Sequence, residues 1–85
     1  MNKRWDDDAW EAYVAWQYED KKTLRRINAL IKDIERNGAL HGIGKPERLK
    51  YGDGYSRRID DANRLIYDID EHGYLYIQSC KGHYK

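Results

Sequence analysis

The sequence contains no phenylalanine, one proline and one cysteine, and no run of apolar residues long enough to cross a membrane. A membrane-spanning helix needs about 20 apolar residues, and no basic and then apolar leader opens the chain. The single cysteine, Cys80, cannot form a disulfide within the chain, and no cysteine or histidine spacing suggests a zinc site. These absences predict a cytoplasmic protein with no metal, no cofactor and no membrane partner.

Aromatic mass comes instead from eight tyrosines and three tryptophans, whose rings each carry a polar group. A chain of 85 residues has room for one core, so we expect residues 1–85 to form a single domain. A domain of this size buries about 60% of the surface that its unfolded chain exposes. Its stability should therefore be modest.

The net charge is only +1, but the charges are unevenly distributed. Residues 1–20 carry two cations and six anions, residues 21–50 carry nine cations and three anions, and residues 51–85 carry five cations and six anions. The basic middle segment is compatible with local contact to nucleic-acid phosphates. The cations between residues 21 and 36 can equally form the solvated face of a helix.

Two amphipathic helices are predicted in the first half of the chain. After a short strand at residues 3–5, three aspartates suited to a helix N-terminus favour a first helix from about Asp7 to Tyr18. The second helix should begin near Asp20, a good N-cap, and end at Asn37 and Gly38. We expect an antiparallel hairpin because no long linker separates the helices. Trp10, Tyr13, Val14 and Gln17 share one face of the first predicted helix, with Trp16 beside them, so we expect this face to be core or helix-packing surface.

Beyond Pro46 the apolar pattern changes to a period of two, which is typical of strands. Strands are predicted at residues 47–50, 55–59, 64–69 and 74–80, and short turns rich in Gly, Asp and Asn separate them. Such short connections join antiparallel neighbours. The sequence therefore predicts an α+β fold, in which the N-terminal short strand and the two-helix hairpin pack on one face of an antiparallel sheet. The other face is left open to solvent or a ligand.

Arg58 and Arg64 flank one of the predicted turns. If that turn contains three residues, pairing of Ile59 with Asn63 sets Arg58 opposite Arg64 on the face away from the helices. Two guanidinium groups placed in this way repel each other unless an anion lies between them. The planar fork of arginine suits phosphate oxygens, so the implied anion is a phosphate. The alternative is that each arginine pairs with a nearby aspartate on the surface.

Glu47 and His83 are the candidate groups for proton transfer. Glu47 lies among Lys45, Arg48 and Lys50, and nearby cations favour the charged form of a carboxylate, which suits a proton acceptor. The alternative is that Glu47 is half of an ordinary ion pair. His83 follows the last predicted strand, where a solvated tail is as good an interpretation as a functional histidine.

Several short motifs follow one another along the whole chain. They are Trp5, Ala15-Trp16-Gln17, Asp20-Lys21-Lys22, Leu30-Ile31-Lys32-Asp33, Gly44-Lys45-Pro46-Glu47, Ser56-Arg57-Arg58-Ile59, Asn63-Arg64-Leu65-Ile66-Tyr67 and Lys81-Gly82-His83-Tyr84. In this order they resemble the YoeB/Txe toxins of the RelE superfamily. The resemblance implies a RelE-like microbial ribonuclease fold and a ribosome-dependent endoribonuclease that cuts messenger RNA.

The resemblance also implies roles for individual residues. Glu47 matches the proposed general base and His83 the general acid, while Arg58 and Arg64 match the arginines that hold and neutralise the phosphate. Glu47 would take the proton of a ribose 2′-hydroxyl, and His83 would protonate the departing 5′-oxygen. The products would be a 2′,3′-cyclic phosphate and a 5′-hydroxyl, without a metal.

Four further residues are expected to serve the substrate. Lys50 matches a lysine that assists the arginines, and Tyr84 matches a tyrosine that orients the RNA. Lys45 and Arg57 adjoin the matched residues, and we assign them to substrate binding. The chain departs from the family at Arg48, where a second proline usually stiffens the strand start.

The family implies three kinds of partner: a YefM-like antitoxin, the 70S ribosome with its messenger RNA, and a second toxin copy in a homodimer or a toxin–antitoxin hetero-oligomer. The antitoxin should be acidic and partly disordered, and should fold on the toxin surface. The alternative function is that of a decayed toxin, which binds RNA or antitoxin without catalysis and acts in operon repression.

Overall fold

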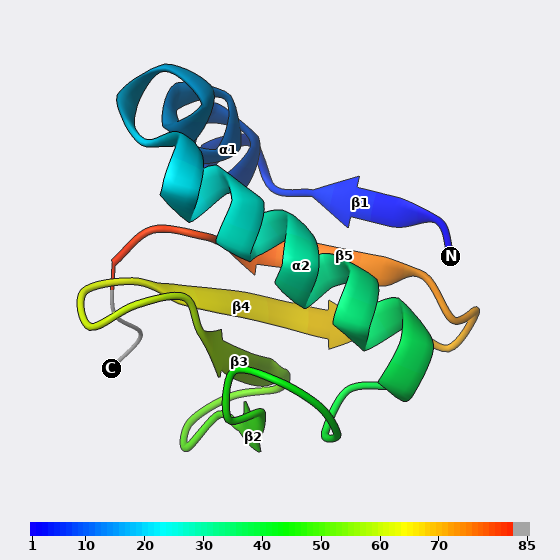
Figure 1. Cartoon of the computed structure of the whole chain (residues 1–85). Coiled ribbons are helices and arrows are strands. Elements are labelled where there is room, and N and C mark those ends of the chain that lie inside the picture. Colours follow the sequence, from blue (N-terminus) through cyan, green and yellow to red (C-terminus); the bar gives the residue numbers. More distant parts are fainter. Residues whose placement is uncertain (83–85) are drawn as a thin grey trace.

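Two helices lie across one face of a five-stranded sheet in the computed structural model, which describes residues 1–82 (Figure 1). The elements are β1 (Lys3–Trp5), α1 (Asp7–Glu19), α2 (Lys21–Asn37), β2 (Glu47–Arg48), β3 (Tyr55–Arg58), β4 (Arg64–Ile69) and β5 (Leu75–Ser79). The predicted α+β architecture is confirmed. Within residues 1–82, neither helix has the length and apolar character that a membrane crossing requires.

The strand order is β1-β5-β4-β3-β2. Strands β2 to β5 form the predicted antiparallel meander, but β1 lies parallel to β5, with Lys3 opposite Leu75 and Trp5 opposite Ile77. The sheet is therefore mixed rather than antiparallel throughout. Parallel neighbours need a long connection, and here nearly the whole chain lies between the two strands.

The junction between the helices is short because one aspartate starts α2 where α1 ends. The Asp20 carboxylate accepts hydrogen bonds from the amides of Lys22 and Thr23, at 3.0 and 3.2 Å, and from the Thr23 hydroxyl at 2.8 Å. These bonds, led by that of the hydroxyl, lower the pKa of Asp20. Asp6 stands at the N-cap of α1 but caps no amide with its side chain, since its carboxylate accepts the Tyr76 hydroxyl instead.

The core lies between α2 and the central strands. Its buried residues are Ile27, Leu30, Ile31 and Ile34 of α2, Ala9 of α1, Leu65 and Tyr67 of β4, Leu75 and Ile77 of β5, and Ile59 and Cys80. Figure 1 shows α2 running diagonally across the strands of the sheet, whereas α1 lies near the edge of the sheet that β1 forms. This packing leaves the opposite face of β3 and β4 uncovered by helices.

The prediction for the core face of α1 was wrong at Trp10, which is 50% exposed, and at Gln17, which is exposed. Ala9 is the buried residue of this helix, since its small side chain lets the helix approach the sheet. Trp16 packs on the core and donates its indole N–H to the Cys80 carbonyl at 3.1 Å. Trp10 packs against Trp5, with ring centroids 5.6 Å apart.

Candidate active site

The predicted register between β3 and β4 is confirmed, because Arg58 is paired with Arg64. The turn closes where the Ile59 amide donates to the Asn63 carbonyl at 3.0 Å, which leaves the expected three residues in the loop. Asp60 stabilises this turn by accepting the Asn63 amide at 2.8 Å. Desolvation raises the pKa of Asp60, but the hydrogen bonds that it accepts outweigh this effect and lower the pKa overall. The turn thus holds two arginines side by side on the open face.

Glu47 joins the arginine pair from the neighbouring strand. It is paired with Ser56, so it lies on the same face, and its Oε1 is 3.9 Å from Nη1 of Arg64. Ser56 and Ile66 are paired between β3 and β4, and each is only 3% exposed. The Glu47 side chain is 65% exposed and that of Arg64 is 27% exposed. Glu47, Arg58 and Arg64 therefore lie on the same face of three neighbouring strands, and the Glu47 carboxylate contacts the Arg64 guanidinium.

The alternative pairing of arginine with aspartate holds for one member of the pair. Arg58 donates through Nη2 to Asp61, whose side chain is 95% exposed. Exposed ion pairs contribute about 0–1 kcal/mol, so this contact is weak enough for a phosphate to replace. Arg64 instead contacts Glu47, so each of the two arginines contacts a carboxylate.

Arg57 requires a correction. It was assigned to substrate binding, but its exposure is 0%, and it lies on the helix-facing side of β3, opposite Leu65. Alternation along a strand sends neighbouring side chains to opposite faces, so Arg57 and Arg58 cannot both reach the open face. Arg57 is bound to Asp33 of α2 and to the loop before β2. It has no surface with which to contact RNA.

Lys45 and Lys50 are exposed cations, one before β2 in the sequence and one after it. Lys45 has a φ of 51°, in the left-handed region that residues other than glycine seldom adopt. It directly precedes Pro46 and Glu47, so this unusual backbone forms part of the turn that leads into β2. Lys50 lies past the end of β2, and its Nζ is 5.6 Å from the centroid of the Tyr51 ring. Arg48 points away from the site, over the ring of Tyr55.

The described part of the chain ends beside Arg64. The Arg64 amide donates to the Gly82 carbonyl at 3.0 Å, and the Gly82 amide donates to Oδ1 of Asn63 at 2.9 Å. These two bonds fix the last described residue against the start of β4. The predicted residues His83 and Tyr84 lie outside the described residues, so their roles stay predictions.

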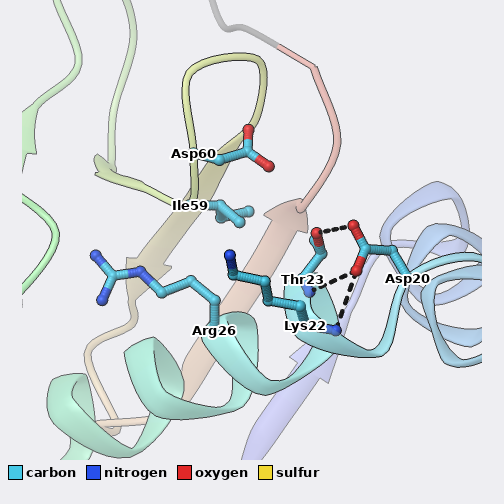
Figure 2. A pocket seen from close by; sticks show the side chains of 6 residues that line it. All are labelled: Asp20, Lys22, Thr23, Arg26, Ile59 and Asp60. Atoms are coloured by element: carbon cyan, nitrogen blue, oxygen red, sulfur yellow. Dashed lines mark hydrogen bonds between the residues drawn. The ribbon is translucent and has the colours of Figure 1, made fainter.

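A cavity of about 310 Å³ lies behind the arginine turn, on the side of α2 (Figure 2). It is lined by Asp20, Lys22, Thr23, Arg26, Ile59 and Asp60. Its two cations are balanced by two aspartates, and Asp20 is already engaged as a helix cap. Arg26 also donates to the Arg58 carbonyl at 3.4 Å. We therefore interpret the residues of this cavity as structural support for β3, with no assigned ligand. Nowhere in residues 1–82 do three potential metal ligands come together.

Sequence reasoning missed two features of this region. The cavity was missed although Lys22 and Arg26 are four residues apart, a spacing that puts both on one side of a helix. The buried position of Arg57 was missed although the register that set Arg58 opposite Arg64 already placed Arg57 on the other face.

Comparison with known proteins gives consistent results over nearly the whole chain. A family model described as the YoeB-like toxin of bacterial type II toxin-antitoxin systems matches residues 5–84. Toxin YoeB of Escherichia coli (strain K12) is 42% identical over 86 residues, covering 99% of this chain and 100% of that protein.

Two solved structures from Staphylococcus aureus support the fold. The YoeB dimer is 49% identical with a TM-score of 0.92, and the match covers 99% of this chain and 98% of that chain. A heterotetrameric YoeB–YefM toxin–antitoxin complex matches with 48% identity, a TM-score of 0.90 and the same coverage of both chains. The fold that the sequence resemblance implied is confirmed.

Proposed function

Because the chain belongs to the YoeB-like toxins of bacterial type II toxin–antitoxin systems, we propose that it is an endoribonuclease that cuts messenger RNA in the ribosomal A site. The observation that carries this proposal is the contact of the Glu47 carboxylate with the Arg64 guanidinium, 3.9 Å apart, beside the paired Arg58. A proton acceptor next to two phosphate-binding cations suits cleavage of a phosphodiester.

Glu47 takes the proton of a ribose 2′-hydroxyl, and the oxygen attacks the adjacent phosphorus. The bond from phosphorus to the 5′-oxygen breaks, and His83 gives that oxygen a proton. The products are a 2′,3′-cyclic phosphate and a 5′-hydroxyl. Arg58, Arg64 and Lys50 stabilise the negative charge that accumulates on the phosphorane, and each well-placed donor contributes about 3 kcal/mol to such stabilisation.

The nucleophile belongs to the RNA, so DNA is not a substrate. Tyr84 stacks on a base, a contact that tolerates any sequence, and Lys45 binds a phosphate of the message. The ribosome orients the message for in-line attack, and orientation can account for about 7–11 kcal/mol of a barrier. The basic residues between 21 and 50 contact ribosomal RNA, in binding that weakens as salt rises.

The partners follow from the same family. The similar S. aureus toxin forms a dimer and a heterotetramer with YefM. For this chain we propose a YefM-like antitoxin that covers the site formed by Glu47, Arg58 and Arg64, and a homodimer or a hetero-oligomer of two toxins with antitoxin. An acidic antitoxin segment would replace Asp61 on Arg58, since that exposed pair is weak.

The test is primer extension on a defined message that purified ribosomes translate. Wild-type protein should cut within the A-site codon, and Arg64→Ala and His83→Ala should each lower the cleavage rate by about 100- to 1,000-fold. Arg4→Ala is the control, because Arg4 is an exposed arginine on β1, at the other edge of the sheet. An intact message in the presence of folded, ribosome-bound wild-type protein would instead establish the non-catalytic binding protein.

A further inference from the structure

The loop between α2 and β2, residues 38–46, is wrapped around the buried guanidinium of Arg57. All five of its N–H donors are used. Nε donates to the Tyr67 hydroxyl at 2.9 Å. Nη1 donates to Asp33 and to the Ile43 carbonyl, and Nη2 donates to the carbonyls of Gly38 and His41, both at 2.8 Å. A lysine has three donors on one atom and cannot make this set of contacts.

Two neighbours of Arg57 bind the same loop. The Tyr67 hydroxyl donates to the Ala39 carbonyl at 2.6 Å, and Oδ2 of Asp33 accepts the Ile43 amide at 3.0 Å. The Arg57 hydrogen bond lowers the pKa of Asp33 and outweighs the opposing effect of desolvation, so this carboxylate stays charged at neutral pH. The network formed by Asp33, Arg57 and Tyr67 thus holds four of the six residues from 38 to 43.

The loop fits this network without spare room. A Cβ added at Gly42 would lie 1.8 Å from Oδ2 of Asp33 and 3.2 Å from Nη1 of Arg57. A Cβ added at Gly44 would lie 2.7 Å from a methyl carbon of Leu30. Both glycines also have positive φ values, of 119° and 82°. Only a chain without side chains at these positions can pass so close to the network.

The ordered loop leads directly to the candidate base. The Gly44 carbonyl accepts the Arg58 amide at 2.7 Å, which fixes the loop to β3 beside the arginine pair. Lys45, with its left-handed backbone, and Pro46 then turn the chain into β2, where Glu47 is the first residue. β2 has only two residues, so its own ladder places Glu47 weakly and the preceding loop must do most of the positioning.

We propose that the Asp33–Arg57–Tyr67 network positions Glu47 for proton transfer by holding residues 38–44 in one conformation, and that Arg57 is a positioning residue. This inference rests on the proposed function, because it takes Glu47 as the base. A buried ion pair is on average no more stabilising than well-packed apolar residues. Loss of the network is therefore expected to change the conformation of the loop as well as to lower the stability of the fold.

The first measurement is amide hydrogen exchange in Tyr67→Phe, which removes one hydroxyl and leaves the ring in the core. The hydroxyl bridges Arg57 and Ala39, so its loss leaves a buried donor and a buried acceptor without partners. We expect exchange of the Ile43 and Arg58 amides to become about tenfold faster. The Leu75 amide, which donates to Asn2 at the far edge of the sheet, should exchange as in the wild type.

The second measurement is the cleavage rate on the ribosome in a double-mutant cycle with Glu47→Gln. Tyr67→Phe should lower kcat about tenfold and change KM by less than about twofold, because the phosphate-binding arginines stay in place. In the Glu47→Gln background the same substitution should cause no further loss. Tyr76→Phe is the matched control, since it also removes one tyrosine hydroxyl, and that hydroxyl donates to Asp6 rather than to the network or the loop.

The outcomes separate the two proposals. If Glu47→Gln is impaired but Tyr67→Phe keeps the wild-type rate, or if the two losses simply add, the positioning role is overturned and the base remains. If the wild type does not cut RNA, or if Glu47→Gln cuts as fast as the wild type, the proposed function is overturned, and with it the role given to the network. Non-additive losses together with faster loop exchange support both. Asp33→Asn provides a second variant if Tyr67→Phe does not fold.

Discussion

Arg57 and Arg58 are consecutive in the sequence and have opposite environments. Arg57 has no exposed surface, and its five donors are bound to a carboxylate, a hydroxyl and three carbonyls. The Arg58 side chain is 40% exposed, and it contacts Asp61, whose side chain is 95% exposed. An arginine on one face of β3 is thus a buried structural residue, and an arginine on the other face is an exposed cation that a ligand can reach. Strand alternation decides which of the two arginines faces the helices and which faces the open side.

The largest expected effect separates the two arginines by stability. Arg57→Ala should lower the free energy of unfolding by about 3–5 kcal/mol, because it breaks a buried ion pair and leaves buried acceptors without donors. Arg58→Ala should cost less than about 1 kcal/mol, as expected for a surface pair. Urea unfolding of both variants checks this difference. Equal losses would show that the two faces of β3 are not energetically distinct.

The next largest effect is on activity: an arginine on the open face should matter for cleavage and little for stability. Arg64→Ala on the open face should lower kcat by about 100- to 1,000-fold, while its free energy of unfolding changes by less than about 1 kcal/mol. The measurements are single-turnover cleavage on ribosomes and urea unfolding of the same preparation. A loss of activity that is matched by a comparable loss of stability would indicate that Arg64 serves the fold.

A smaller effect concerns pH on the buried side. The pKa of Asp33 is below its ordinary value of 3.8 in the folded protein, chiefly because of the hydrogen bond from Arg57. The unfolded chain therefore takes up this proton first as the pH falls. The stabilisation is complete above pH 3.8 and is lost as the pH falls through the lower folded value. Unfolding of wild type and Asp33→Asn between pH 2 and pH 7 should show a stability difference that narrows in this acid range; a constant difference would contradict it.

The smallest expected effect is an increase in RNA affinity when a carboxylate is removed from the open face. Asp61→Asn removes the carboxylate that Arg58 contacts, so RNA should bind more tightly, by about two- to fivefold. The increase should disappear in the Arg58→Ala background, because the contact between Asp61 and Arg58 is already lost there. Binding of a non-cleavable RNA analogue to ribosome-bound protein measures both. Weaker binding in Asp61→Asn would show that the aspartate supports the site.

Local patterns in the sequence predicted much of this fold. The apolar spacing of α2 and the capping ability of Asp20 fixed the helix at nearly its observed length. The segregation of apolar from basic residues on β3 and β4 fixed the register that pairs Arg58 with Arg64. These features depend on neighbours within a few residues, which is why a sequence pattern can specify them.

Longer-range features were not predictable in this way. The parallel pairing of β1 with β5 joins segments at opposite ends of the chain, and no local pattern specifies it. Ala9 replaced Trp10 in the core because the approach of α1 to the sheet depends on the whole packed assembly. The role of Arg57 depends on the carbonyl groups of the loop that surrounds it. Every residue has a backbone carbonyl, so the amino-acid sequence does not show which of them will accept from an arginine.

Cys80 gives this chain a chemical reporter of its own. Burial raises the pKa of its thiol to about 11, and its exposure is 0%, so alkylating reagents should not reach a thiolate in the folded protein. The sequence has no other cysteine, and Cys80 adjoins both Ala9 and Trp16 of α1. The rate of its modification should therefore measure how often α1 separates from the sheet, without any engineered label.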